Sequence, residues 1–230
     1  WVRALHYRLE ERQAIRRMKE WLASWNPDVV FAAWTITSGY VAARAGARPL
    51  ALYPWGSDVL YFPPLHGWCR KRSVAALRAA DLWVCNAHHT ADAAKALAGG
   101  APRVEILPIE VDAGVFAPER ADRSTFERLW PGRKVVMTSR PLKDLYDHAT
   151  ILRAMEKVDA ALFVTSDGPL RESLQKMAKG PTHFAGYVPD GDLPKLLAAC
   201  DVYVSASITD SASSAIFEAM ACERPVVASD

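Results

Sequence analysis

The 230-residue sequence lacks several features that would each define a class of protein. No apolar run approaches the roughly 20 residues that a membrane-spanning helix needs, which argues against an integral membrane protein. The net charge of +2 is far from the basic excess expected of a dedicated nucleic-acid binder. Half of the residues are hydrophobic and 23% are charged, a balance that excludes disordered and collagen-like chains.

Signature motifs of common enzyme classes are also missing. There is no G-x-G-x-x-G after a strand pattern, no G-x-x-x-x-G-K-[ST], no H-E-x-x-H and no G-x-S-x-G. These absences argue against a dinucleotide oxidoreductase, a P-loop NTPase, a zinc protease and an α/β-hydrolase.

Cysteine is scarce, and its spacing is uninformative for metal binding. Cys69, Cys85, Cys200 and Cys222 are far apart and form no C-x-x-C pair. Cys85 and Cys200 lie in or beside apolar segments, where a buried thiol behaves as a small hydrophobic side chain. The sequence therefore predicts neither a metal site nor a disulfide framework, and it favours the reducing cytoplasm.

What the sequence does contain is an alternation of strand and helix patterns. Apolar strands that alternate with helices predict parallel sheets covered on both faces, an α/β fold. The strand runs are 28–34, 50–55, 82–86, 104–109, 134–139, 160–166, 183–188, 202–207 and 225–229. The segments with helical spacing are 8–25, 38–45, 68–79, 90–97, 146–156, 170–178, 193–199 and 213–222.

The alternation is interrupted once, between Pro108 and Lys134, where prolines and scattered charges predict a connection with one short helical piece at 124–130. We therefore predict two Rossmann-like domains, residues 1–115 and 116–230, with a ligand cleft between them. The chain begins at Trp1 and stops at Asp230 directly after an apolar run, so we expect both domains to be incomplete.

Charge is distributed unevenly along the chain. The first 110 residues carry 14 Lys and Arg against 9 Asp and Glu, and the remainder carry 14 against 17. Arg8, Arg12 and Arg16 share one helix face, and a second basic cluster, 70–72, lies beside Trp68. These clusters fit a contact with anionic lipid, an anionic acceptor or a solvated helix face.

The most informative segment is 205–230. A strand ends at Ser207, small residues follow, and a helix begins near Ser213, a geometry that presents main-chain N–H groups to a phosphate. Asp210 lies in the turn, and Glu218 follows eight residues later among apolar neighbours. A carboxylate in such surroundings usually has a specific partner, such as a ribose diol.

This segment resembles the signature of the family 4 glycosyltransferases, retaining enzymes with the GT-B fold that use nucleotide-sugar donors. The family pattern has two acids eight apart, then Ala-Met-Ala-x-Gly-x-Pro-Val-Val. Here it is Asp210-x7-Glu218, then Ala219-Met-Ala-Cys-Glu-Arg-Pro-Val-Val227. Five further segments are similar to the family in the right order, and they are Trp55–Asp58, Ile106–Asp112, Ser139–Tyr146, Ser166–Pro169 and Phe184–Val188.

The resemblance implies a role for each matching residue. Arg140, and less strongly Lys143, would neutralise the leaving diphosphate. Asp210 would bind donor-sugar hydroxyls, Glu218 would bind the ribose, and Asp210 with Arg140 would form the catalytic pair. The remaining donor-binding residues would be Gly168, Ser211, Ala212, Ser213 and Ser214, and the acceptor side would include Gly56 and Asp58.

The leading hypothesis is a retaining glycosyltransferase that moves a sugar from a nucleotide-diphosphate donor to a glycan, lipid or small-molecule acceptor. It would need no metal or other cofactor and would bind no nucleic acid. It would be cytoplasmic or peripheral to the inner membrane, and the 230-residue chain would be inactive by itself. The alternative is a non-catalytic nucleotide- or sugar-binding scaffold, favoured by Asp210 in place of Glu and by Ser211 and Ser213 in place of glycines. A sugar-nucleotide epimerase ranks third, because its paired acids are not evident.

Overall fold

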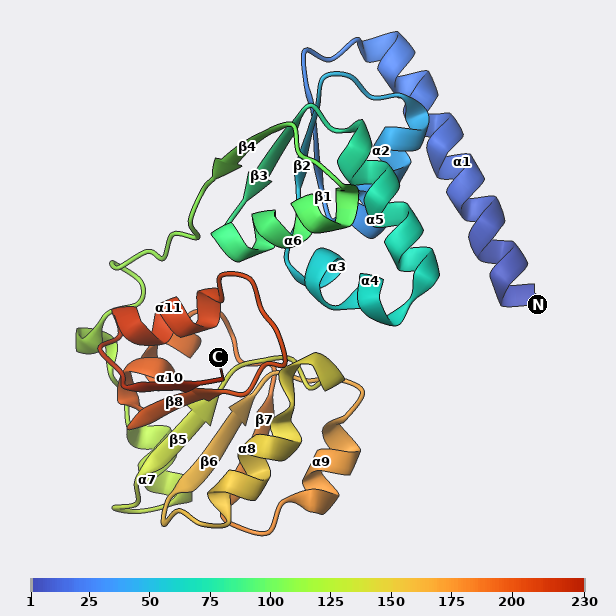
Figure 1. Ribbon diagram of the computed structural model, residues 1–230. Coiled ribbons are helices and arrows are strands. Elements are labelled where there is room, and N and C mark those ends of the chain that lie inside the picture. Colours follow the sequence, from blue (N-terminus) through green and yellow to red (C-terminus); the bar gives the residue numbers. More distant parts are fainter. Residues whose placement is uncertain (1, 230) are drawn as a thin grey trace. The chain divides into compact units, whose positions relative to one another are not determined.

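The computed structural model describes residues 2–229, with side chains from residue 9 onward, and divides into two compact units. The first unit runs to Pro108 and includes the segment Asp210–Ala212. The second comprises Ile109–Thr209 and continues from Ser213. Each unit is an α/β structure with its own parallel sheet, as the alternating pattern predicts (Figure 1).

The first unit has a four-stranded parallel sheet in the order β1-β2-β3-β4. Its strands are β1 (Val30–Ala33), β2 (Leu50–Tyr53), β3 (Leu82–Cys85) and β4 (Arg103–Ile106). Its helices are α1 (Val2–Trp25), the π-helix Thr35–Gly39, α2 (Tyr40–Ala45), α3 (Ser57–Leu60), α4 (Phe62–Leu65), α5 (Gly67–Ala79) and α6 (His88–Ala98). Helix α1 packs on α2 and α2 packs on α5, so these three helices form one layer (Figure 1).

The second unit has a five-stranded parallel sheet in the order β7-β6-β5-β8-β9. Its strands are β5 (Val135–Thr138), β6 (Ala161–Thr165), β7 (Thr182–Gly186), β8 (Val202–Ser205) and β9 (Val226–Ala228). Its helices are α7 (Ser124–Leu129), α8 (His148–Met155), α9 (Arg171–Met177), α10 (Leu193–Ala199) and α11 (Ser214–Ala221), with short 3-10 turns at Pro118–Arg120 and Asp144–Tyr146.

Helices cover both faces of the second sheet. Because successive residues of a strand point to opposite faces, the sheet contributes side chains to a core layer on each side. Val135, Met137 and Tyr203 are fully buried against α7, α10 and α11. Leu162 and Val164, from the inner strand β6, pack instead on α8 and α9. The continuous apolar character of these strands, visible in the sequence, therefore reflects two separate core layers.

All nine predicted strands are present, and the predicted helices are found within about two residues of their expected bounds, except that α1 begins at Val2, six residues before the predicted start at residue 8. Within the predicted connection 108–134, the short helical piece expected at 124–130 is present as α7 (Ser124–Leu129), and it is part of the second unit's core. Phe126 is fully buried in the core of the second unit, and Trp130 packs against the same core. Aromatic residues in this stretch were the available sign that it folds onto the sheet.

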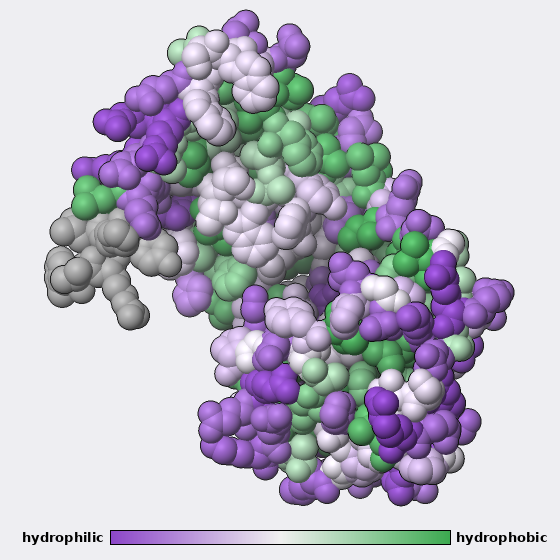
Figure 2. All heavy atoms as spheres, turned by 180° about the vertical axis from the view of Figure 1, so that it is seen from behind, coloured by the Kyte–Doolittle hydropathy of each residue, from purple (hydrophilic) through white to green (hydrophobic). Residues whose placement is uncertain are grey.

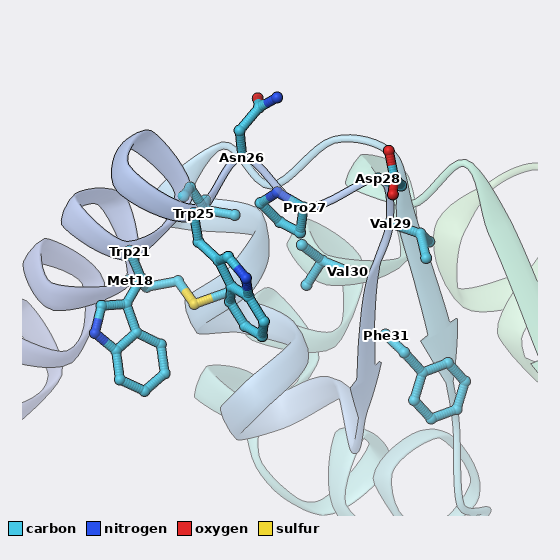
Figure 3. Close-up of a pocket in the computed structure, with 10 residues that line it drawn as sticks. Met18, Trp21, Trp25, Asn26, Pro27, Asp28, Val29, Val30 and Phe31 are labelled. Atoms are coloured by element: carbon cyan, nitrogen blue, oxygen red, sulfur yellow. The ribbon is translucent and has the colours of Figure 1, made fainter.

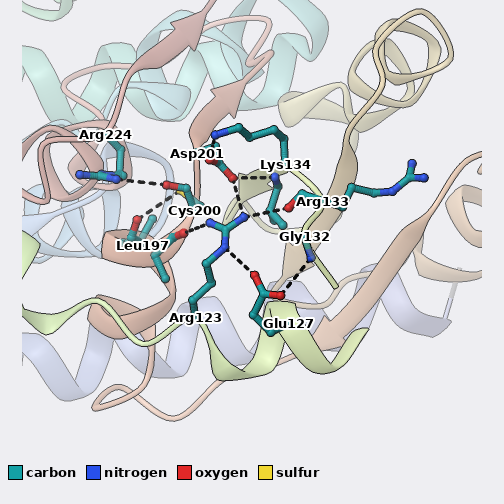
Figure 4. Close-up of polar contacts among 11 residues, drawn as sticks. Arg123, Glu127, Gly132, Arg133, Lys134, Leu197, Cys200, Asp201 and Arg224 are labelled. Atoms are coloured by element: carbon teal, nitrogen blue, oxygen red, sulfur yellow. Dashed lines mark hydrogen bonds and ion pairs between the residues drawn. The ribbon is translucent and has the colours of Figure 1, made fainter. Parts of the chain in front are cut away.

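A cluster of hydrogen bonds and ion pairs joins α7 to the sheet of the second unit (Figure 4). The Arg123 guanidinium donates to the carbonyl oxygen of Ala199, to that of Arg133 and to Oδ2 of Asp201, all within 3.0 Å. Asp201 also accepts from the main-chain N–H of Val135 at 2.8 Å. These bonds join α7, α10 and the start of β5 at the end of the sheet opposite the candidate site.

All four cysteines are buried and free, as predicted for Cys85 and Cys200. Burial raises the pKa of the Cys200 thiol to about 12 and that of the Cys85 thiol to about 11, so both stay protonated at neutral pH. Within residues 2–229, no helix combines the length and hydrophobicity needed to cross a bilayer.

Large apolar side chains reach the surface in both units (Figure 2). In the first unit, Trp21, Trp25 and Phe31 border an apolar hollow of about 540 Å³ between the end of α1 and the start of β1 (Figure 3). This hollow lies at the amino end of β1. The candidate site residues that follow β2 lie at the carboxyl end of the sheet, so the hollow is separate from them.

Candidate functional site

The second sheet has one topological switch point, between β5 and β8. The chain runs from β5 outward through β6 to β7 and then returns to place β8 on the other side of β5. In open parallel sheets of this kind, ligands bind beyond the carboxyl ends of the strands at the switch point. The loops that leave β5 and β8 at this edge begin at Ser139 and Ala206, and they carry most of the residues predicted from the sequence.

Arg140 is the central cation of this edge. Its Nη1 donates to the hydroxyl of Ser213 at 3.0 Å, so the loop after β5 contacts the residue that precedes α11. Its guanidinium carbon lies 4.3 Å from the centre of the Tyr146 ring. A hydroxyl and an aromatic face thus contact the group from two directions, and the roles predicted for Arg140 and Ser213 stay predictions.

Glu218 lies in α11 within electrostatic range of Arg140. The side chain is half-buried, and burial raises the pKa of its carboxyl, an effect that the Arg140 charge partly offsets. Its neighbours are less enclosed than their apolar character suggested, because Met220 is 56% exposed. The structure therefore brings Arg140, Ser213 and Glu218 together within one unit.

A buried tyrosine of the sheet forms a hydrogen bond with the same loop. The hydroxyl of Tyr203, in β8, lies 3.0 Å from the Ser139 hydroxyl, and Tyr203 is fully buried. No pattern in the sequence singled out Tyr203, and Ser139 and Tyr146 were included only as the ends of the segment Ser139–Tyr146. The pairing of β5 with β8 brings Tyr203 to this loop, and strand order was not part of the prediction.

For two of the predicted donor-binding residues, Lys143 and Ser214, the structure shows no side-chain contact with Arg140 or Glu218 among the described interactions. Lys143 is exposed, and among the described ion pairs none includes its ammonium. Ser214 is half-buried as the first residue of α11. Their roles stay predictions.

Gly168 contacts the Arg140 loop through the main chain. A β-carbon at this position would lie 2.5 Å from the carbonyl oxygen of Leu142, which forces a glycine here. Leu142 in turn donates its N–H to Asp167 at 3.1 Å and accepts from the N–H of Leu170 at 3.1 Å. The turn at Gly168 therefore packs against the loop that carries Arg140 and restricts its conformation.

Asp210, Ser211 and Ala212 group with the first unit. Oδ1 of Asp210 accepts from the main-chain N–H of Ser211 at 2.9 Å, so that N–H already has a partner in this structure. The Asp210 carbonyl oxygen lies 2.9 Å from Nε2 of His89, and the Ser211 hydroxyl lies 2.5 Å from that of Thr90. Ser213, Ser214 and Glu218 belong to the second unit, so the predicted turn is shared.

The two residues predicted for the acceptor side follow β2 in the first unit. Gly56 has a φ of +107°, and a β-carbon there would lie 2.7 Å from that of Ser211, so glycine is required. Asp58 is fully buried, and its carboxylate accepts from the N–H of Thr35 at 2.6 Å and from that of Trp55 at 2.9 Å. Asp58 therefore positions the loops after β1 and β2 rather than facing solvent.

His148 is a buried histidine at the start of α8 that the sequence analysis did not identify. It is 3% exposed, and neither ring nitrogen has a hydrogen-bond partner within the described residues. Burial lowers the pKa of His148 to about 4, and the neighbouring Arg140 charge acts in the same direction. The imidazole is therefore neutral at physiological pH.

The low pKa of His148 predicts an acid-sensitive second unit. Above pH 6.5 the imidazole is neutral in both the folded and the unfolded chain. As the pH falls from 6.5 to 4, only the unfolded chain takes up the proton, which costs the folded state about 3 kcal/mol. Urea unfolding of the second unit at several pH values measures this loss, which His148→Leu should remove and His88→Leu, at an exposed site, should leave intact. Equal pH slopes for wild type and His148→Leu would contradict the assignment.

The basic clusters have different surroundings. The side chain of Arg8 lies outside the described residues, while Arg12 and Arg16 are exposed on α1. At the start of α5, Arg70 and Lys71 are exposed, and Arg72 pairs with Glu11. Among the side chains that the structure describes, those of residues 9–229, no group of three His, Cys, Asp or Glu could hold a metal ion.

Comparison with known proteins identifies the family. Residues 2–87 match the family model described as Glycosyl transferase 4-like, and residues 130–230 match Glycosyl transferases group 1. The chain belongs to the family 4 glycosyltransferases, which have the GT-B fold.

Two curated relatives illustrate the range of similarity. TuaC of Bacillus subtilis, named as a candidate glycosyltransferase of teichuronic acid biosynthesis, is 26% identical over 89% of this chain and 53% of its own length. A GDP-mannose-dependent α-(1-6)-phosphatidylinositol monomannoside mannosyltransferase of Mycolicibacterium smegmatis is 29% identical over 96% of the chain and 63% of its own length. The chain therefore spans about half to three-fifths of these relatives.

Solved structures confirm the fold. HepE of Anabaena, crystallised with UDP-glucose, superposes with a TM-score of 0.76 at 21% identity, over 95% of this chain and 62% of that one. Sucrose-phosphate synthase of Thermosynechococcus elongatus superposes with a TM-score of 0.78 at 17% identity, over 93% and 59%. The predicted two-domain GT-B architecture is thus confirmed.

Proposed function

We propose that this chain is part of a retaining hexosyltransferase that moves a sugar from a nucleotide-diphosphate donor to a glycan, lipid or small-molecule acceptor, and that its second unit binds the donor. The observation that carries the proposal is the meeting of Arg140, Ser213 and Glu218 at the switch point between β5 and β8. A cation, a hydroxyl and a half-buried carboxylate are the groups that a diphosphate and a ribose need. The names of the curated relatives and the UDP-glucose bound to HepE support the same donor class.

The proposed reaction needs no protein nucleophile. The acceptor hydroxyl oxygen forms a bond to the anomeric carbon, and the bond between that carbon and the diphosphate oxygen breaks on the same face. The proton of the acceptor hydroxyl moves to the departing phosphate oxygen. Arg140 stabilises the charge that develops on the diphosphate, which is why we expect transfer without a metal.

The alternative is a nucleotide- or sugar-binding scaffold without turnover. The hydrogen bond from the Ser211 N–H to Asp210 favours it, because that donor is then occupied within the turn. The two serines of this turn also replace glycines of the family pattern.

Donor titration separates these two functions. Calorimetry with UDP-, GDP- and ADP-sugars identifies the donor, and the full-length gene product is then assayed for sugar release. We expect one donor to bind, Glu218→Ala to weaken its binding about tenfold, and the product to keep the donor's anomeric configuration. Binding that Glu218→Ala leaves unchanged, with no turnover of any donor, would support the scaffold instead.

We also propose that the protein acts in the cytoplasm with peripheral contact to an anionic membrane. The corner between α4 and α5 supports this, because Leu65 and Trp68 are more than half exposed beside the exposed cations Arg70 and Lys71. Trp at such a corner suits the headgroup region, and Lys and Arg suit anionic lipid.

Vesicle sedimentation tests this contact. We expect binding to phosphatidylglycerol vesicles, little binding to phosphatidylcholine vesicles, and loss of binding in 0.5 M salt, a concentration of about three times the physiological value. Equal binding to both kinds of vesicle would contradict a charge-driven contact.

A further inference from the structure

Tyr146 places an aromatic ring against Arg140, the side chain proposed to bind the diphosphate. Its ring centre lies 4.3 Å from the guanidinium carbon of Arg140, within the range of a cation–π contact. Because the ring covers the guanidinium from one side and Ser213 accepts from Nη1 at 3.0 Å, both the tilt and the in-plane rotation of the group are constrained.

The chain around Tyr146 is itself held firmly on both sides. Before it, the carbonyl oxygen of Leu145 accepts from the N–H of Ile208 at 2.8 Å, and the Tyr146 N–H donates to Lys143 at 3.0 Å. After it, Asp147 adopts a φ of +33° and caps α8, because Oδ1 of its carboxylate accepts from the main-chain N–H of Thr150 at 3.2 Å. A non-glycine residue rarely adopts this backbone conformation, so the turn is set by its surroundings.

The next residue adds a second constraint. His148 is almost fully buried, which fixes the start of α8 in the core of the second unit. Tyr146 thus lies between two constrained elements. The loop before it is hydrogen-bonded to the segment after β8, and helix α8 after it begins in the core of the second unit. The ring therefore offers the Arg140 guanidinium a surface whose position is set by the surrounding chain.

We propose that Tyr146 is a positioning residue that orders the Arg140 guanidinium for a nucleoside diphosphate and so contributes to the preference for diphosphate over uncharged nucleoside. This inference rests on the proposed function, because it assumes that Arg140 contacts the diphosphate. A guanidinium donates in its own plane, so stacking one face on a ring fixes the direction of its donors without competing for them. Without the ring, the Arg140 side chain would lose conformational entropy when it binds the diphosphate, and this loss would weaken binding. With the ring, the side chain is already ordered before the diphosphate binds.

The test compares ligands as well as variants. Calorimetry on the 230-residue chain first identifies which of UDP, GDP and ADP binds, and the corresponding nucleoside serves as the ligand without phosphate. We expect Tyr146→Leu to weaken diphosphate binding about 2- to 30-fold and to leave nucleoside binding unchanged. Tyr146→Phe, which keeps the ring, should stay within about twofold of wild type, as should Tyr187→Leu at a ring that is 82% exposed elsewhere in the unit.

The outcomes distinguish the positioning role of Tyr146 from the proposed binding of a diphosphate by Arg140. If Arg140→Ala weakens diphosphate binding but Tyr146→Leu does not, the inference is overturned and the function stands. If no nucleoside diphosphate binds wild type, or Arg140→Ala has no effect, the proposed function itself fails.

Should Tyr146→Leu unfold, Tyr146→Met and a free-protein NMR measurement decide the question. The ring current of Tyr146 should shift the Arg140 Hε signal upfield in wild type and in Tyr146→Phe, but not in Tyr146→Met. An unshifted Arg140 signal in wild type would contradict the stacking.

Discussion

Replacing Arg140 by alanine is expected to weaken nucleoside diphosphate binding about 100-fold while leaving the fold intact. A charge-assisted hydrogen bond to phosphate contributes about 1.5–3 kcal/mol, and a forked guanidinium can make two. The loss of about 3 kcal/mol corresponds to the stated factor. Calorimetric titration with UDP, GDP and ADP measures it.

The arginine cannot be replaced by lysine at this site without loss. Arg140→Lys keeps the charge but loses the planar group that stacks on Tyr146 and donates to Ser213, so we expect most of the affinity to be lost. Arg128→Ala, at an exposed position of α7, is the matched control and should bind like wild type. An Arg140→Ala variant with undiminished affinity would show that the diphosphate binds elsewhere.

The second large effect is expected at Gly168. A methyl group there would lie 2.5 Å from the carbonyl oxygen of Leu142 and 2.9 Å from its nitrogen, both main-chain atoms of a fully buried residue. Relief requires the loop to move, so we expect Gly168→Ala to destabilise the second unit by about 3 kcal/mol and to weaken diphosphate binding, because the loop carries Arg140.

The chain offers a matched control for this substitution. No heavy atom comes within 4 Å of a β-carbon built on Gly180, so Gly180→Ala should change stability little. Urea unfolding of both variants with calorimetry gives the comparison. Equal stability and equal diphosphate affinity for Gly168→Ala and wild type would show that this contact does not constrain the loop.

Features that depend on one short stretch of chain were predictable from the sequence. The strands β5, β6 and β8 are continuous apolar runs, and such runs bury both faces whatever their neighbours are. Helices α3 and α4 were missed because each has only four residues, too few for a helical period to show.

Features that depend on strand order were not predictable in the same way. Arg140 and Ser213 were selected by resemblance, yet their contact requires β8 to lie beside β5. The stacking of Tyr146 on Arg140 has no periodic signal at all. Asp58 was assigned to the acceptor side from its motif, but only the structure shows that its carboxylate is fully buried and bound to two main-chain N–H groups.

The central claim is that the donor diphosphate binds at the carboxyl edge of the second sheet, between the loops after β5 and β8. Hydrogen exchange with and without the tightest-binding nucleotide sugar tests this location directly. We predict slower exchange in Ser139–Tyr146 and Ser213–Glu218, and no change around the apolar hollow beside α1. Protection confined to that hollow, or no protection in either loop at saturating ligand, would contradict the account.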